Sequence, residues 1–149
     1  MKTGRLAGGS RFPRSDDSVR AASSRGDRPV LTGLNILLVE DEALIAIDVG
    51  QLLADTECRV IGPCRDVVDA LHAIENEHID CGILDIRLGA EHSLHLADML
   101  VARNVPFIWM SGYDAQILPA QHRNRPFLCK PFAADELFDA LAAALASRV

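Results

Sequence analysis

Short apolar runs recur along the chain from Leu34 onward, with amphipathic stretches between them. Each run is too short for a helix and too continuously apolar for a strand that has one face in water. Such runs are typical of a parallel sheet that is covered on both faces. The sequence therefore predicts five buried strands, around residues 36–39, 60–61, 83–84, 107–110 and 127–129.

Four of the intervening stretches space their apolar residues as one face of a helix requires. In the first, Ile45, Val49 and Leu52 follow positions i, i+4 and i+7. Comparable patterns predict helices around residues 67–74, 94–103 and 137–145, whereas residues 114–125, interrupted by Pro119, have the weakest pattern. Strands that alternate with helices indicate an α/β fold, a doubly wound parallel sheet with right-handed crossovers.

The amino-terminal part of the chain differs from the rest in charge. Residues 1–33 contain seven Lys or Arg and three acids, although the whole chain has a net charge of −6. They are rich in Gly, Ser and Arg and lack hydrophobic periodicity, so we predict that residues 1–32 form a disordered basic leader. A basic arm can contact nucleic acid or anionic lipid, but a solvated tail is the simpler interpretation. The acidic remainder argues against direct binding of nucleic acid.

No apolar stretch has the length of a membrane span or of a signal peptide, which predicts a cytoplasmic protein without a membrane partner. The four cysteines are scattered along the chain without the paired spacing of a zinc site. We interpret those in apolar runs as small buried residues in a reducing compartment.

Polar side chains gather where four of the predicted strands end. They are three acids after the first strand, one acid at the end of the third, a hydroxyl after the fourth and a lysine after the fifth: Glu40, Asp41, Glu42, Asp85, Ser111 and Lys130. The carboxyl ends of parallel strands share one edge of the sheet, so we expect these groups to converge. Any one of them is explained as a helix-terminal or solvated charge. The whole set at four strand ends indicates a functional site.

Clustered carboxylates repel one another and are well satisfied by Mg²⁺, which prefers oxygen ligands. A carboxylate beside such an ion can attack phosphorus, and phosphoryl transfer needs mainly alignment and neutralisation of the oxygens. Asp85, alone at its strand end, is the expected nucleophile. Glu40 and Asp41 are the expected metal ligands, and Lys130 and Ser111 the groups that contact the phosphoryl oxygens.

Four segments, LLVEDE, ILDIRL, WMSGYD and FLCKPF, resemble the signature segments of response-regulator receiver domains, in the family's order. The resemblance covers about residues 33–147 and places the domain at 33–149. It implies a CheY-like fold, a flavodoxin-like (βα)5 receiver with strand order 2-1-3-4-5. It also implies Mg²⁺ as cofactor, Asp85 as phospho-acceptor and Lys130 as the phosphate-binding lysine.

The resemblance assigns three further roles. The backbone carbonyl of Arg87 is a further metal ligand, in addition to Glu40, Asp41 and Asp85. Ser111 and Phe127 correspond to the hydroxyl and the aromatic residue of the family's switch.

By the same resemblance, the protein is a stand-alone response regulator of a two-component phosphorelay. A histidine kinase or phosphotransfer protein would phosphorylate it, and the phosphate would switch the binding of a downstream protein. Only one helix follows the last predicted strand, so we expect no output domain. We also expect a monomer or weak homodimer, and no enzyme activity beyond its own phosphoryl transfer and autodephosphorylation.

One segment departs from the usual pattern of the family. The proline that commonly follows the acceptor loop is absent, since Ile-Arg-Leu-Gly-Ala follows Asp85. Residues 106–130 resemble the FAT GUY subgroup of receivers. This likeness implies a partner kinase of the HWE class.

Three alternatives stay open at this point. The domain could serve as a phosphate sink or relay intermediate. A phosphorylation-independent interaction module of the same fold would lack an acceptor, an acid pair or a lysine, and none is missing here. A cofactor-binding flavodoxin-like protein would need a phosphate-binding loop after the first strand, where this chain has three acids.

Overall fold

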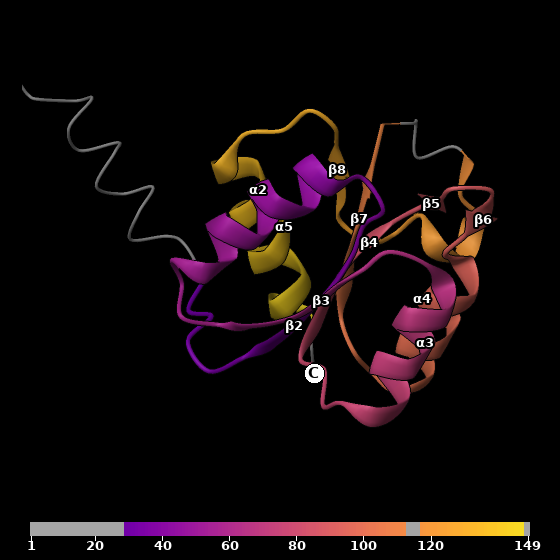
Figure 1. The fold of residues 1–149 in the computed structure, drawn as a ribbon, viewed down its shortest axis with the longest axis horizontal. Coiled ribbons are helices and arrows are strands. Elements are labelled where there is room, and N and C mark those ends of the chain that lie inside the picture. Colours follow the sequence, from indigo (N-terminus) through magenta and orange to yellow (C-terminus); the bar gives the residue numbers. More distant parts are fainter. Residues whose placement is uncertain (1–28, 113–116, 148–149) are drawn as a thin grey trace, which may run out of the picture.

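The computed structural model describes residues 29–112 and 117–147 as a sheet between two layers of helices (Figure 1). Its five parallel strands are β2 (Asn35–Val39), β3 (Arg59–Cys64), β4 (Cys81–Asp85), β7 (Phe107–Ser111) and β8 (Phe127–Cys129). Across the sheet their order is β3-β2-β4-β7-β8. In chain order this is second, first, third, fourth, fifth, so the predicted fold class and strand order are confirmed.

Helices cover both faces of the sheet, which explains the continuous apolar runs. Figure 1 shows α2 (Ala43–Ala54) and α5 (Ala134–Ala146) on one face, and α3 (Val67–Asn76) and α4 (Leu94–Ala102) on the other. Alternate residues of β2 enter different cores: Ile36 packs in the α2 and α5 layer, and Leu37 in the opposite layer. Both side chains are fully buried. Consecutive residues of a strand buried on both faces lie in apolar surroundings, so such a strand is apolar over several successive positions.

Local sequence determines where two of the helices begin. The side chain of Asp66 accepts a hydrogen bond from the amide of Asp69 at 2.8 Å and so caps α3. At the start of α5, the Glu136 side chain accepts from the amide of Ala133 at 2.8 Å. Asp135 and Glu136 also place negative charge in the first turn of α5, where the helix dipole favours it.

Two segments differ from regular alternation of strands and helices. A small antiparallel hairpin, β5 (Arg87–Leu88) and β6 (Glu91–His92), follows the third strand, and the sequence did not predict it. Between β7 and β8, the described residues form only a 3₁₀ turn, η2 (Ala120–His122). This agrees with the weak helical pattern of residues 114–125, of which residues 114–116 lie outside the described part.

The edge strand β3 contains a bulge. Leu37 pairs with Ile61 and Val39 with Cys64, so Gly62 and Pro63 both lie opposite one residue of β2. Gly62 has φ +116°, and a Cβ there would lie 2.6 Å from the Leu38 carbonyl oxygen. Only glycine fits this backbone without distortion.

The folded part of the chain begins before the predicted boundary at residue 33. Leu31 is 1% exposed and packs in the core of the α2 and α5 layer. Thr32 donates from Oγ1 to the Thr56 carbonyl at 3.3 Å. These two residues therefore contact the folded domain, although the prediction assigned them to the leader, since a single apolar side chain in a polar segment makes no pattern; the domain boundary itself stays a prediction. Residues 1–28 of the predicted leader lie outside the described part.

Within residues 29–112 and 117–147, both cores are formed by residues from Leu31 onward. We therefore expect deletion of residues 1–28 to shift the thermal midpoint by less than about 2 °C. Circular dichroism melts of the full and shortened chains would measure this shift. A fall of more than about 5 °C would show that the leader contributes to the fold.

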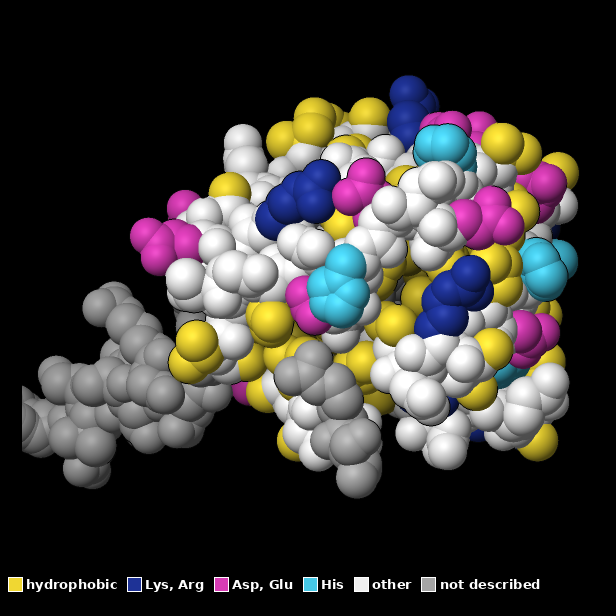
Figure 2. All heavy atoms as spheres, turned by 90° about the horizontal axis from the view of Figure 1, so that it is seen from below, with side chains coloured by type: hydrophobic (Ala, Val, Ile, Leu, Met, Phe, Trp, Pro, Cys, Tyr) yellow, Lys and Arg dark blue, Asp and Glu magenta, His cyan; other side chains and the backbone are white. Residues whose placement is uncertain are grey.

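The surface is mixed in charge on the face that Figure 2 shows, where basic, acidic and histidine side chains are interspersed with apolar ones. Among the described residues, no helix combines the length and the apolar character that crossing a membrane requires.

Candidate functional site

The register of the sheet places the predicted site residues along one edge. Asp85, the last residue of β4, pairs with Met110, and Ser111 pairs with Cys129. Glu40 and Asp41 follow β2 directly, and Lys130 follows β8. The structure therefore brings together residues at the ends of four strands that are far apart in the sequence.

Three carboxylates form the centre of the site. Glu40, Asp41 and Asp85 each offer an oxygen, and these oxygens all lie within 4.8 Å of one another. Glu40 is fully buried and Asp85 is 5% exposed. Oxygen donors this close, with so little solvent to screen them, fit a hard divalent cation such as Mg²⁺. Arg87, whose carbonyl is the fourth expected ligand, lines the same open cleft as Asp41 and Asp85.

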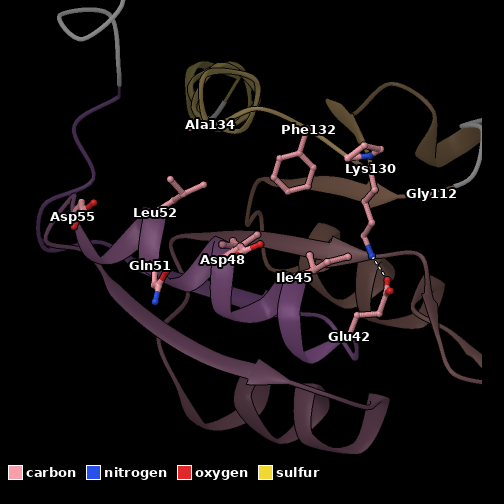
Figure 3. A pocket seen from close by; sticks show the side chains of 12 residues that line it. Glu42, Ile45, Asp48, Gln51, Leu52, Asp55, Gly112, Lys130, Phe132 and Ala134 are labelled. Carbon is pink, nitrogen blue, oxygen red and sulfur yellow. Dashed lines mark hydrogen bonds and ion pairs between the residues drawn. The ribbon is translucent and has the colours of Figure 1, made fainter.

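Lys130 places its ammonium group among these carboxylates. Its Nζ lies 2.6 Å from Glu40 Oε1, 2.9 Å from Glu42 Oε1 and 3.1 Å from Asp85 Oδ2. Figure 3 shows the side chain extending from the end of β8 to Glu42 at the start of α2. Glu42 was predicted to lie at this edge, but its contact with Lys130 was not anticipated.

Burial and pairing shift the ionisation of two of these groups. Burial raises the pKa of the Glu40 carboxyl from 4.5 to about 7, although hydrogen bonds from Lys130 and from the Glu42 amide lower it. Burial by itself lowers the pKa of Lys130, but hydrogen bonds to Glu40 and Glu42 and the charge of Asp85 raise it above its usual value. Lys130 therefore stays cationic at neutral pH.

Two contacts that could not be expected from the sequence hold the loop after Asp85 in place. Ser93, fully buried before α4, donates from Oγ to the Asp85 carbonyl at 2.5 Å. The Gly89 amide, in the turn between β5 and β6, donates to Asp41 Oδ2 at 2.9 Å. Gly89 has φ +61°, a conformation that glycine adopts without strain. In place of the usual proline, hydrogen bonds hold this loop.

The two residues predicted to form the switch, Ser111 and Phe127, lie on the neighbouring strands β7 and β8. Ser111 is fully buried, and its carbonyl accepts from the Lys130 amide at 2.8 Å. Phe127 is only partly buried and packs against the core of the α3 and α4 layer. It pairs with Trp109, which is fully buried. Tyr113 and Asp114, which complete the WMSGYD segment, lie outside the described residues.

A groove of about 830 Å³ runs from the site along α2. Its apolar side chains include Ile45, Leu52 and Phe132 (Figure 3). Glu42, Asp48 and Asp55 line it as well. The groove joins Lys130 to an acidic and apolar surface of α2.

The family model described as response regulator receiver domain matches residues 36–142. The chain belongs to this family. The predicted family is thereby confirmed, and with it the general role of a response regulator in a two-component system. The FAT GUY subgroup stays a prediction.

Similar proteins include several regulators. The phyllosphere-induced regulator PhyR of Methylorubrum extorquens is 33% identical over 65% of this receiver domain chain and 38% of PhyR. The transcriptional regulatory protein PdtaR of Mycobacterium tuberculosis is 24% identical over 71% of the chain and 54% of PdtaR. The receiver chain thus spans about half the length, or less, of these curated relatives.

The match to one solved structure extends over almost the whole of that protein. SdrG from Sphingomonas melonis Fr1 is 37% identical, with a TM-score of 0.67, over 78% of this chain and 98% of SdrG. A BeF3-activated conformation of SdrG, from Pseudomonas melonis Fr1, is 39% identical over 74% of this chain and 95% of that one, with a TM-score of 0.64.

Proposed function

We propose that this receiver domain accepts a phosphoryl group on Asp85 from a histidine kinase or phosphotransfer protein. One observation carries the proposal: the Asp85 carboxylate lies between two further carboxylates and the ammonium of Lys130. Such a site pairs a nucleophile with groups that can balance the charge of a phosphoryl group.

Each site residue has a role in this transfer. Glu40, Asp41, Asp85 and the carbonyl of Arg87 would hold Mg²⁺, which neutralises charge on the phosphoryl oxygens when bound. Lys130 Nζ, 3.1 Å from Asp85 Oδ2, would contact a second phosphoryl oxygen. The Ser111 hydroxyl would donate to a third.

The transfer itself exchanges one bond for another. An Asp85 carboxylate oxygen attacks the phosphorus of a phosphohistidine on the partner, and the P–N bond breaks. The electron pair of that bond returns to the imidazole nitrogen. The product is an acyl phosphate on Asp85, whose phosphoryl oxygens carry roughly −1.5 to −2 units of charge in place of the single negative charge of the carboxylate.

The surface next to the site suits a protein partner. Leu44 and Ile47 on α2 are 79% and 54% exposed, close in sequence to the Glu42 side of the site. Exposed apolar side chains rimmed by acids are typical of a docking surface. The donor kinase or phosphotransfer protein would therefore approach over α2 and the groove beside it.

Incubation with acetyl phosphate tests the proposal. We expect the chain to gain one phosphoryl group in the presence of Mg²⁺, measured by intact-protein mass spectrometry. Removing Mg²⁺ with EDTA should lower the rate of uptake by about tenfold or more, since the clustered carboxylates then stay uncompensated. Restoring excess Mg²⁺ is the control. Uptake that is equally fast in EDTA would contradict the proposal.

A further inference from the structure

His122 joins two elements on the α3 and α4 side of the sheet. It belongs to η2, is 2% exposed, and its Nε2 lies 2.8 Å from Oδ1 of Asp98 on α4. Its backbone carbonyl accepts from the indole Nε1 of Trp109 at 3.0 Å. One residue therefore connects the β7–β8 connection both to α4 and to the middle of β7.

Trp109 and α4 are each linked to the phospho-acceptor site through further residues. Trp109 is two residues before Ser111 on β7, so the two side chains share a face of the sheet, and it pairs with Phe127. Along the other route, α4 begins after Ser93, whose Oγ donates to the Asp85 carbonyl. The contact between His122 and Asp98 therefore connects the residues linked to the site through β7 with those linked to it through α4.

Only one of the two ring nitrogens of His122 takes part in the contact with Asp98. Nε2 faces the Asp98 carboxylate, and Nδ1 is the other nitrogen of the ring. Nδ1 is buried, and among the described residues no group donates to it. A buried polar atom without a partner costs stability, and this cost offsets part of what the contact between His122 and Asp98 contributes.

We propose that His122 is a positioning residue that couples the acceptor site to α4, as a clasp that resists the switch of Phe127. Phe127 is only partly buried, whereas the neighbouring Trp109 is fully packed. Trp109 makes edge contacts with Phe107 at 5.3 Å and with His122 at 5.9 Å between ring centroids. To turn inward, the Phe127 ring needs space beside Trp109. The contact between His122 and Asp98 keeps the surroundings of Trp109 closely packed, so this space is not open. The inference rests on the proposed phosphorylation of Asp85.

Removing the clasp should therefore favour the switched arrangement, and coupling is reciprocal between the two sites. Asp98→Ala is the variant of choice, because the Asp98 side chain is 59% exposed and its loss leaves the core intact. We expect the variant to bind beryllofluoride about threefold to tenfold more tightly in the presence of Mg²⁺. Binding is measured by ¹⁹F NMR titration. Asp98→Asn, which keeps the shape but not the charge, should give a smaller change.

Trp109, the single tryptophan of the chain, gives a second readout. In wild type we expect beryllofluoride to change its emission, and in Asp98→Ala the emission should lie closer to the beryllofluoride-bound spectrum from the start. The matched control is Asp139→Ala, an exposed aspartate on α5 that undergoes the same change in helix propensity. It should leave both readouts at wild-type values.

The outcomes separate this inference from the function on which it rests. Normal beryllofluoride binding with unchanged affinity in Asp98→Ala would overturn the clasp and leave phosphorylation of Asp85 standing. An equal gain in Asp98→Ala and Asp139→Ala would also overturn it, because helix propensity alone would then explain the gain. Absence of beryllofluoride binding in wild type would overturn both.

Discussion

Replacing Asp85 with asparagine is expected to abolish phosphate uptake from acetyl phosphate. Asparagine keeps the shape of the side chain, which is 5% exposed, but an amide is not a nucleophile toward phosphorus at neutral pH. The neighbouring Glu40 is a poor substitute, because it is fully buried and bound to Lys130. Intact-protein mass spectrometry with Mg²⁺ measures the loss.

Glu42→Gln is the matched control for this variant. Its side chain is 61% exposed and contacts Lys130 at 2.9 Å, as part of the same cluster. The substitution removes one carboxylate without removing the proposed acceptor, so most of the uptake should persist. If Asp85→Asn gained phosphate at the wild-type rate, the acceptor would lie elsewhere on the chain.

Glu40→Gln should stabilise the metal-free protein, and more so as the pH rises. Burial raises the pKa of Glu40 from 4.5 to about 7 in the folded protein. The folded state therefore holds a proton that the unfolded chain has lost. The contribution of Glu40 to stability is fully present below 4.5 and disappears as the pH rises through about 7.

Glutamine has no proton to lose, so the variant escapes this penalty. Between about pH 5 and pH 7.5 its advantage over wild type in free energy of unfolding should grow by about 2 kcal/mol. Urea unfolding in EDTA at both pH values measures it. Glu42→Gln serves again as the control, since an exposed carboxylate carries little desolvation cost. An advantage for Glu40→Gln that does not depend on pH would rule out this explanation.

The strands and most helices could be predicted because their sequence patterns reflect burial directly. The run from Ile36 to Val39 is apolar at every position, and the structure buries every one of these residues. The β5–β6 hairpin has two residues in each strand, too few for any period to be visible. Leu31 was missed for a similar reason, because one buried side chain makes no pattern.

The composition of the site could be predicted, but not its internal contacts. Parallel strands end at one edge, so residues that follow β2, β4, β7 and β8 had to lie close together. Which carboxylates Lys130 contacts depends on side-chain geometry. Likewise, His122 and Asp98 are 24 residues apart, and neither has a neighbour in the sequence that marks the pair.

The two outer strands of the sheet determine how other chains can approach it. β3 carries the bulge at Gly62 and Pro63, and a proline has no N–H to offer a neighbouring strand. β8, at the opposite edge, has three residues and is followed by Lys130 and Pro131. Short edges that carry prolines and charge discourage edge-to-edge aggregation. We therefore expect partners to recognise this protein through its helices and loops. We also expect that strands of other chains do not add to the edges of its sheet, even at high protein concentration.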